Sequence, residues 1–279
     1  MRNNRVFITA YKNRNDEYYT DYNDIEKDLS FYEAEFSGKT VYCPCDDFRW
    51  SNFVRYFKSN YHRLHLTGLL ASNYNTGEGA YKYRYDGNVE VYVPTPTGDF
   101  RTDEIDPLLR ASDVIVTNPP FSLLRDFYTK IRGKEMLIMA PLTAAAYNAI
   151  FPDIKEGLLN VDLKGYRQFT SAEGEKKNIT NLIWLTTFNP PYHPLELTET
   201  YSEEKYPVYD THPDIIEVGR TKRIPRDYTG KMGVPLSYIK YHHREEFELL
   251  DTCEDPIVGG VQKFRRFIIS AKSTPRTLR

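Results

Sequence analysis

The stretch Asp113-Val114-Ile115-Val116-Thr117-Asn118-Pro119-Pro120-Phe121 joins a compact apolar run to a stiff polar loop. A short apolar run of this kind, bounded by turn residues, is typical of a strand buried in a parallel sheet. After the loop, Ser122 can cap a helix whose inner side carries Leu124, Phe127 and Ile131. The stretch therefore predicts a strand, a loop at its carboxyl end, and a helix.

Segments on both sides of this stretch repeat the pattern. Apolar runs predict strands at residues 39–43, 64–71, 136–140, 161–163 and 181–188, and helical spacing predicts helices at residues 22–36, 50–57, 123–131 and 143–150. The turn Asp86-Gly87-Asn88 lies between two more runs and predicts an inserted β-hairpin. Alternating strands and helices predict an α/β fold with a mostly parallel sheet, which binds ligands beyond the carboxyl ends of its strands.

The loop Asn118-Pro119-Pro120-Phe121 carries groups that can activate an aromatic amine. Such an amine is a poor nucleophile because its lone pair is delocalised into the ring. The carboxamide of Asn118 and the carbonyl of Pro119 can accept hydrogen bonds from the amino group and turn its lone pair towards a methyl donor. Pro120 stiffens the loop, and Phe121 can stack on a base that has left the duplex. The loop therefore predicts methyl transfer without a metal or a strong base.

A second copy of this tetrapeptide, Asn189-Pro190-Pro191-Tyr192, also follows a predicted strand. It runs into His193-Pro194, which blocks a helix. No βα pattern follows it, whereas the first copy has enough chain before it for several βα units. We therefore expect Asn118 to be catalytic and the second copy to be a turn.

Composition restricts the partners and the setting. With 37 basic and 39 acidic residues among 279, the net charge of −2 gives no general basic field, so a nucleic acid would need a local basic surface. Three cysteines and an N-terminus without a secretory apolar core predict a reducing, intracellular (cytoplasmic) setting. We expect no membrane span, because polar residues interrupt the apolar stretch at 137–151. We also expect no metal, because Cys43-Pro44-Cys45 has no second ligand pair.

The chain changes character near residue 190, where prolines crowd in and the βα alternation stops. Residues 1–189 are therefore expected to form the catalytic core with the cofactor site, and residues 190–279 a loop-rich appendage packed on it. Two basic clusters of the appendage are candidates for contact with a phosphate backbone, although a solvated surface and a frayed tail are the alternative. The first cluster contains Arg220, Lys222, Arg223, Arg226 and Lys231. The second contains Lys263, Arg265, Arg266, Lys272, Arg276 and Arg279.

Several motifs besides the loop resemble the EcoRI-type adenine-specific DNA methyltransferases, from about Asp16 to Pro235. The resembling segments are Asp16-Glu17-Tyr18-Tyr19-Thr20, residues 41–47 with Trp50-Ser51-Asn52-Phe53, Gly98-Asp99-Phe100, residues 210–218 and residues 224–235. The resemblance implies a Rossmann-like class I methyltransferase fold, whose seven-stranded sheet ends in an antiparallel strand.

The resemblance also implies roles for individual residues. It places S-adenosylmethionine against Tyr18, Tyr19, Thr20, Cys45, Asp46, Asp47, Ser51, Phe53, Asp99 and Phe100. Asp47 would lie near the amino group of this cofactor. Asp99 would accept a hydrogen bond from its adenine amine, and Phe100 would pack on that ring. Asn118, Pro119, Pro120 and Phe121 would form the catalytic loop.

The sequence departs from the usual methyltransferase pattern at two places. Residues 43–53 contain none of the glycines that let backbone approach the cofactor closely. The second predicted strand ends near Ser72-Asn73 without an acidic residue that could bind the cofactor ribose, which leaves Glu78 as the candidate.

The sequence therefore favours methylation of adenine N6 in double-stranded DNA, with S-adenosylmethionine as donor, the target base flipped out, and restriction–modification as a setting. Basic residues Arg220, Lys222, Arg223, Arg226 and Lys231 would contact the DNA. One alternative is a methyltransferase that acts on an RNA base or a protein glutamine. Another is a catalytically silent protein that binds the cofactor and DNA. The sequence indicates neither the recognised DNA sequence nor the oligomeric state.

Overall fold

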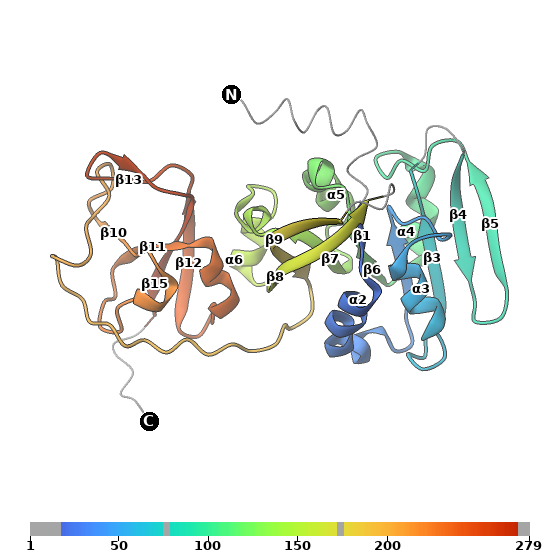
Figure 1. The fold of residues 1–279 in the computed structure, drawn as a ribbon, viewed down its shortest axis with the longest axis horizontal. Helices are drawn as coiled ribbons and strands as arrows, with labels where there is room; N and C mark the ends of the chain where they lie inside the picture. Colours follow the sequence, from blue (N-terminus) through green and yellow to red (C-terminus); the bar gives the residue numbers. More distant parts are fainter. Residues whose placement is uncertain (1–17, 75–78, 172–175, 273–279) are drawn as a thin grey trace. The chain divides into compact units, whose positions relative to one another are not determined.

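A computed structural model describes residues 18–74, 79–171 and 176–272. The chain folds into two compact units (Figure 1). The first runs to Pro141 and resumes over Lys164–Pro190, and the second consists of Leu142–Leu163 and the chain from Pro191 onward. The boundary expected from sequence lies between residues 189 and 190, so the two divisions differ over Leu142–Leu163.

The first unit is built on one large mixed sheet, with strand order β1-β8-β9-β7-β6-β2-β3-β4-β5. The strands are β1 (Tyr18–Thr20), β2 (Thr40–Pro44), β3 (Gly68–Ser72), β4 (Ala80–Tyr85), β5 (Glu90–Thr95), β6 (Val114–Thr117), β7 (Glu135–Pro141), β8 (Asn160–Ser171) and β9 (Lys176–Thr186). The described sheet thus has nine strands, where the family resemblance implies seven. The α/β class predicted from sequence is confirmed.

The central strands of the sheet are parallel, and the order in which the chain adds strands across the sheet reverses there. β2 pairs in parallel with β3 and β6, and β6 pairs in parallel with β7. Antiparallel strands flank this centre, with β9 beside β7 and the pair β4–β5 beside β3. Because the chain progresses from β2 to β3 in one direction and from β6 to β7 in the other, the switch point lies between β2 and β6. Open α/β sheets bind ligands beyond the carboxyl ends of the strands at such a point.

Helices pack against this sheet and lead into its loops. They are α2 (Tyr22–Leu29), α3 (Asn52–Ser59), α4 (Asp106–Ala111) and α5 (Leu124–Ile131), with 3₁₀ turns η1 (Ser30–Phe36), η2 (Asp103–Ile105) and η3 (Phe121–Leu123). The prediction that Ser122 caps a helix is wrong, because Ser122 lies inside η3 and α5 begins only at Leu124.

Both faces of the parallel centre are buried. On one face, Val41, Leu69, Val116 and other alternate strand residues form a single apolar cluster with the inner residues of α2 and α3. Their neighbours along the strands, such as Tyr42 and Ile115, are buried as well. Since side chains of a strand alternate between faces, these neighbours cover the opposite face. Burial on both sides explains the nearly continuous apolar runs in the sequence.

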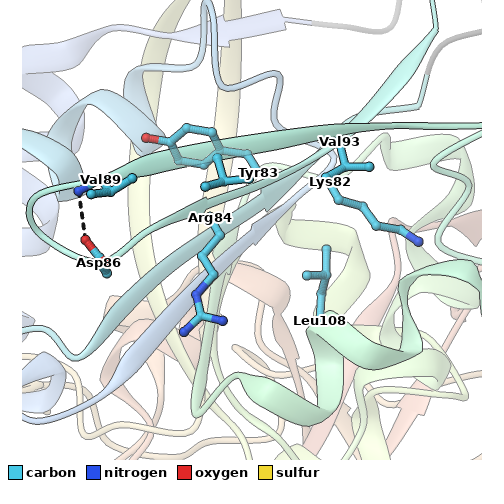
Figure 2. A pocket seen from close by; sticks show the side chains of 8 residues that line it. Lys82, Tyr83, Arg84, Asp86, Val89, Val93 and Leu108 are labelled. Atoms are coloured by element: carbon cyan, nitrogen blue, oxygen red, sulfur yellow. Dashed lines mark hydrogen bonds between the residues drawn. The ribbon is translucent and has the colours of Figure 1, made fainter.

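The β4–β5 hairpin forms one edge of the sheet, as the Asp-Gly turn predicts. The carboxylate of Asp86 accepts hydrogen bonds from the backbone N–H groups of Asn88 and Val89, at 3.0 and 2.8 Å. Figure 2 shows the face on which Lys82, Arg84 and Val93 line a shallow hollow that Leu108 of α4 closes from the side. The register pairs Lys82 with Val93 and Arg84 with Val91, so basic and apolar side chains share this exposed face.

The second unit has a sheet of its own, which was not predicted from the sequence. Its strand order is β10-β11-β15-β12, and a separate hairpin is formed by β13 and β14. The elements are η4 (Leu142–Ala146), α6 (Phe151–Glu156), β10 (Ile215–Glu217), η5 (Thr221–Arg223), β11 (Lys231–Pro235), η6 (Leu236–Tyr241), β12 (Phe247–Cys253), β13 (Ile257–Val258), β14 (Val261–Gln262) and β15 (Arg266–Ala271). The helix predicted over 143–150 is replaced by η4 and α6.

A buried ion pair holds the strands of this second sheet together. Arg266 and Glu217 are each less than a tenth exposed, and the guanidinium donates to the carboxylate at 3.1 and 2.7 Å. The hydroxyl of Tyr209 donates to the same carboxylate at 3.0 Å. Arg266 was predicted to be part of a basic surface, and its burial corrects that prediction. Arg276 and Arg279, from the same cluster, lie outside the described residues.

Candidate active site

Asp46 joins the carboxyl ends of β2 and β6 at the switch point. Its buried carboxylate accepts hydrogen bonds from the hydroxyls of Ser51 and Thr117, each at 2.6 Å. Its backbone N–H donates to the carbonyl of Ser72 at 2.9 Å. The chain turns into this arrangement at Cys45, which has a φ of +63° although it is not glycine. Asp46 therefore ties the loop after β2 to the residue that directly precedes Asn118.

The start of α3 completes the loop after β2. The hydroxyl of Ser51 accepts hydrogen bonds from the N–H groups of Phe53 and Val54, so the side chain that donates to Asp46 also caps the helix. The next residue, Asn52, donates from Nδ2 to the carbonyl of Thr20 at 2.8 Å. Phe53 is buried against Trp184 of β9. These contacts bring the N-terminal segment and the first loop together.

Asp47 is held from two sides. Arg49 donates to its carboxylate from Nε at 2.9 Å and from a terminal nitrogen at 2.6 Å, and Asn73 donates from Nδ2 at 3.2 Å. The guanidinium of Arg49 also lies over the ring of Tyr81, 5.1 Å from its centroid. The hairpin strand β4 thus helps to hold the loop after β2.

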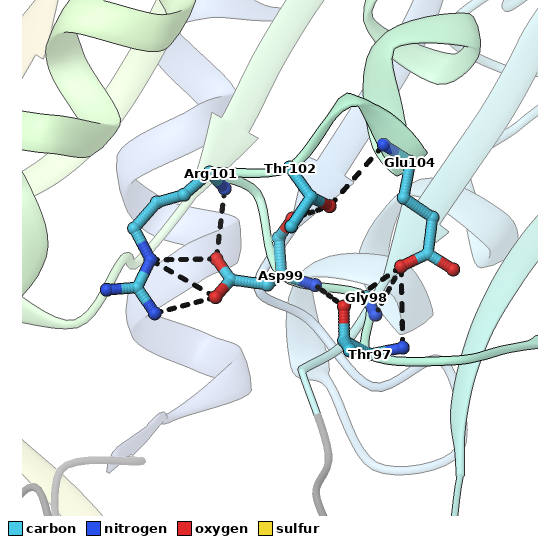
Figure 3. A network of polar contacts seen from close by, with 6 residues as sticks. All are labelled: Thr97, Gly98, Asp99, Arg101, Thr102 and Glu104. Carbon is cyan, nitrogen blue, oxygen red and sulfur yellow. Dashed lines mark hydrogen bonds and ion pairs between the residues drawn. The ribbon is translucent and has the colours of Figure 1, made fainter.

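The segment after β5 adds a third carboxylate, that of Asp99, to those of Asp46 and Asp47. Asp99 binds Arg101, which donates to both carboxylate oxygens at 2.6–3.1 Å (Figure 3). The hydrogen bonds from Arg101 hold the pKa of Asp99 below its usual value. Glu104 accepts hydrogen bonds from Thr97 and from the N–H of Gly98, which fixes the turn. The same turn leads into Phe100.

Phe100 faces the protein interior. It is 5% exposed, and its ring lies edge-on to Phe127 of α5, with 5.1 Å between the centroids. A cofactor ring, as predicted from the sequence, could contact only the small exposed part of this side chain. In the present arrangement, Phe100 anchors the Asp99 turn to α5, the helix that follows the loop predicted to be catalytic.

The loop predicted to be catalytic follows β6 directly. Asn118 is half-buried, and Pro119 is buried beside it. The carbonyl of Pro120 accepts a hydrogen bond from the N–H of Leu123 at 3.0 Å, which forms the first turn of η3. The ring of Phe121 packs partly against the apolar cluster on one face of the sheet. The loop is therefore anchored at both ends.

The second tetrapeptide has different surroundings. Asn189 is exposed, and no regular element is found over residues 189–207. The ring of Tyr192 contacts His243, with 4.1 Å between the ring centroids. The absence of a helix after this tetrapeptide agrees with the prediction, but residues 189–192 form irregular chain rather than an assigned turn.

Hydrogen bonds connect some of the predicted cofactor residues in the first unit. The carboxylate of Asp46 binds the hydroxyls of Ser51 and Thr117, and Asn52, the neighbour of Ser51 in the chain, binds the carbonyl of Thr20. Asp47 binds the side chain of Asn73, whose backbone carbonyl lies against Gly98. The side chains of Tyr18 and Tyr19 lie outside the described residues. So does Glu78, the candidate ribose ligand.

Sequence reasoning did not assign a role to several residues that build this site, namely Arg49, Asn52, Asn73, Arg101 and Thr117. Four of them share a signal of position: Arg49 and Arg101 stand two residues after an aspartate, Thr117 ends β6, and Asn73 directly follows β3. That signal is weak in a single sequence, because such residues are also common in ordinary turns.

Comparisons with known proteins agree with this geometry. The family model described as adenine-specific methyltransferase EcoRI matches residues 6–91 and 86–276. Type II methyltransferase M.EcoRI of Escherichia coli is 37% identical over 290 residues, covering 88% of this chain and 89% of the relative. The chain belongs to the EcoRI family of adenine-specific methyltransferases. The resemblance seen in the sequence is thus confirmed.

Two mycoplasma proteins support the same assignment. Type II methyltransferase M.MgeORF184P of Mycoplasma genitalium is 32% identical, covering 90% of this chain and 87% of the relative. Type II methyltransferase M.MpnI of Mycoplasma pneumoniae is 33% identical, covering 90% of this chain and 86% of the relative. No solved structure matches the chain. As a member of this family, the chain is a DNA methyltransferase.

The basic residues expected to contact DNA all lie in the second unit of this EcoRI-family enzyme. Arg220, Lys222, Arg223 and Arg226 are exposed around η5. Lys231, at the start of β11, forms an ion pair with Asp214 at 2.8 Å. The hydroxyl of Tyr206 donates to the carbonyl of Arg223 at 2.8 Å. Four of the five predicted residues thus present their charge to solvent from one short segment.

Other features of the described residues concern metals, thiols and membranes. All three cysteines are free thiols. Within residues 18–74, 79–171 and 176–272, no group of three His, Cys, Asp or Glu side chains is arranged to hold a metal ion. None of the helices in these ranges has the length and apolar character needed to cross a bilayer.

Proposed function

We propose that this enzyme transfers a methyl group from S-adenosylmethionine to N6 of adenine in double-stranded DNA, with the target base flipped out. The observation that carries the proposal is the hydrogen bond between Asp46 and Thr117 at the switch point. It joins the loop predicted to hold the cofactor to the residue that precedes Asn118. A donor site and an amine-binding loop at this one point are what a direct methyl transfer requires.

The catalytic loop would act by orienting the amine. We assign Asn118 to accept a hydrogen bond from the N6 amino group through its carboxamide oxygen, and Pro119 to accept another through its carbonyl. These contacts strengthen as the nitrogen becomes pyramidal and positive, so they favour the transition state. The N6 lone pair then forms the new C–N bond, and one N6 proton passes to solvent.

The residues of the candidate donor site fit S-adenosylmethionine. When bound, this cofactor would supply the methyl group from a sulfonium sulfur, which would keep the electrons of the C–S bond and leave as a neutral thioether. The hydroxyl oxygen of Thr20 is buried and has no hydrogen-bond partner among the described residues, so it can serve the polar methionine end. Asp47 and Asp99 are carboxylates suited to an ammonium group and to an adenine amine, respectively.

Phe121 would stack on the flipped base. Base-modifying enzymes extrude their target because the reacting atom is inaccessible inside the duplex. The exposed part of the Phe121 ring follows Pro120 directly, so a base held by Asn118 would lie within reach of this aromatic surface.

The basic segment of the second unit would bind the DNA backbone. Arg220, Lys222, Arg223 and Arg226 are exposed side chains on one short stretch, which suits contact with successive phosphates. Residues 191–279 would therefore form the DNA-contacting part. The type II names of the relatives support a place in restriction–modification. Three free thiols and a DNA substrate fit a reducing, intracellular setting.

The substrate class is tested by offering the purified enzyme DNA, RNA and protein in parallel with radiolabelled S-adenosylmethionine. We expect label in double-stranded DNA and none above background in the other two. Label in RNA or protein at a comparable rate would contradict the proposal. Cofactor binding measured by calorimetry without transfer to any acceptor would identify a silent binding protein instead.

A further inference from the structure

The side chain of Asn73 contacts two segments of the candidate donor site at once. Asn73 directly follows β3 and is 6% exposed. Its Nδ2 donates to the carboxylate of Asp47 at 3.2 Å, and its Oδ1 accepts from the backbone N–H of Tyr81 at 2.9 Å. One carboxamide therefore links the loop after β2 to the first strand of the hairpin.

The backbone of Asn73 contacts a third segment. Gly98 lies so close to its carbonyl that a Cβ atom at Gly98 would come within 2.0 Å of the Asn73 oxygen. Gly98 also has a φ of +59°, which disfavours any other residue. The turn that carries Asp99 is thus fitted directly against Asn73 (Figure 3 shows the turn itself).

We infer that Asn73 is a positioning residue, which holds the Asp47 carboxylate in the orientation that receives the ammonium group of the methyl donor. This inference rests on the proposed function. Arg49 also binds Asp47, but it lies only two residues away on the same loop, and its contact outside the loop is with the ring of Tyr81. Asn73 comes from the end of a buried parallel strand, so its contact fixes the loop relative to the sheet.

The chemistry of the contact requires a neutral amide. The side chain must donate to Asp47 and accept from Tyr81, and a carboxamide does both. An aspartate could still accept from Tyr81, but it could not donate when ionised. It would also place a second negative charge about 3 Å from Asp47, which is unfavourable. This explains in physical terms why the second parallel strand is not followed by an acidic residue.

Asn73→Asp is the discriminating variant, and Asn60→Asp is its matched control. Asn60, at the end of α3, uses its carboxamide in the same two ways. It donates to the carbonyl of Tyr56 and accepts from the guanidinium of Arg63. Calorimetric titration with S-adenosylmethionine should show that N73D binds about tenfold more weakly or worse, as expected for a lost hydrogen bond to a charged group. N60D should keep its affinity within about twofold.

A double-mutant cycle separates positioning from a general effect on folding. Because Asn73 acts through Asp47, N73D should have little further effect on affinity in a D47A background. If N73D does not fold, N73A carries the same cycle. Wild-type affinity in N73D, or an equal loss in both backgrounds, would overturn the inference. A wild-type enzyme that does not bind S-adenosylmethionine would instead contradict the proposed function.

Discussion

Asn118 and Asn189 stand in nearly identical tetrapeptides but differ in their surroundings. Asn118 is half-buried at the switch point, whereas Asn189 is exposed and has no regular element after it. We predict that Asn118→Ala lowers the single-turnover rate of methyl transfer by about a hundredfold or more, as for loss of one preorganised transition-state contact. The affinity for S-adenosylmethionine should change little.

Asn189→Ala is the matched control for this variant. It removes the same carboxamide from the same tetrapeptide, so it should leave the single-turnover rate within about twofold of wild type. A large loss of rate in Asn189→Ala together with a small one in Asn118→Ala would contradict the assignment of the catalytic loop.

His242 makes the stability of the second unit dependent on pH. Burial, reinforced by the positive charge of Arg244, lowers the pKa of His242 to about 3 from the usual 6.5. Its Nδ1 lies 3.2 Å from the hydroxyl of Tyr238. Burial raises the pKa of Tyr238, so this hydrogen bond joins a protonated phenol to a neutral imidazole. Acidification must therefore charge a histidine that the fold keeps neutral.

The sign of this effect follows from proton binding. Between pH 3 and 6.5 the unfolded chain binds a proton at His242 that the folded protein does not, so the free energy of unfolding falls as the pH falls. The expected slope is about 1 kcal/mol per pH unit. Denaturant unfolding should show that His242→Gln reduces this slope and that His243→Gln keeps it. Equal slopes in His242→Gln and wild type would refute the prediction.

At the scale of elements, the loop after β2 makes a sharp turn without glycine. Cys45 itself takes a φ of +63°, a conformation unusual for residues with a side chain. The hydrogen bonds of Asp46 with Ser51 and Thr117 offset the energetic cost of this backbone conformation. The missing glycines that distinguish this sequence are therefore replaced by a strained residue and a buried carboxylate that holds it.

The basic segment around η5 gives a prediction about salt dependence. If Arg223 and Arg226 contact phosphates, replacing either by alanine should weaken binding to unrelated DNA sequences alike and reduce the slope of log affinity against log salt by about 1. Fluorescence anisotropy over a salt series measures both quantities.

Lys205→Ala is the control for these variants. Lys205 is exposed in the same unit but lies 3.5 Å from Glu199, so its charge is already balanced. It should leave the salt slope unchanged. Unchanged slopes in Arg223→Ala and Arg226→Ala would show that the segment does not contact the DNA backbone.

The elements that the sequence predicted well share one physical property. β2, β6, β7 and the β4–β5 hairpin lie close to their predicted positions, because burial on both faces or an Asp-Gly turn leaves a strong local pattern. α3 starts at Asn52 rather than Trp50, because the N–H groups of Trp50 and Ser51 bind the carbonyl of Asp47 in a turn. In the second unit, β10, β13 and β14 have only two or three residues each and β11 ends at a proline, so they left no such pattern. β12 and β15 are as long as the strands of the hairpin but were not predicted.

The candidate site was predicted only in part for a related reason. Asp46, Ser51 and Asn118 were named from motifs, and the structure brings their segments together. Asn73 and Thr117 were not named, because their importance depends on contacts with Asp47 and Asp46, which lie 26 and 71 residues away in the sequence. A single sequence shows which residues follow strands but not which of them meet.

At the scale of the whole molecule, the chain combines a unit that carries the candidate donor site with a unit that carries the basic segment. The family assignment identifies an adenine-specific DNA methyltransferase. We propose in addition that the carboxamide of Asn118, which directly follows Thr117 of the Asp46 network, activates the adenine amine. That claim concerns which atom of DNA receives the methyl group.

The most direct test is to identify the methylated nucleoside. Double-stranded DNA is incubated with the enzyme and isotopically labelled S-adenosylmethionine, then digested and analysed by liquid chromatography and mass spectrometry. We expect label in N6-methyldeoxyadenosine with the wild-type enzyme and its loss in Asn118→Ala, which should still bind the cofactor. Label in a methylated cytosine, or undiminished N6 methylation by Asn118→Ala, would contradict it.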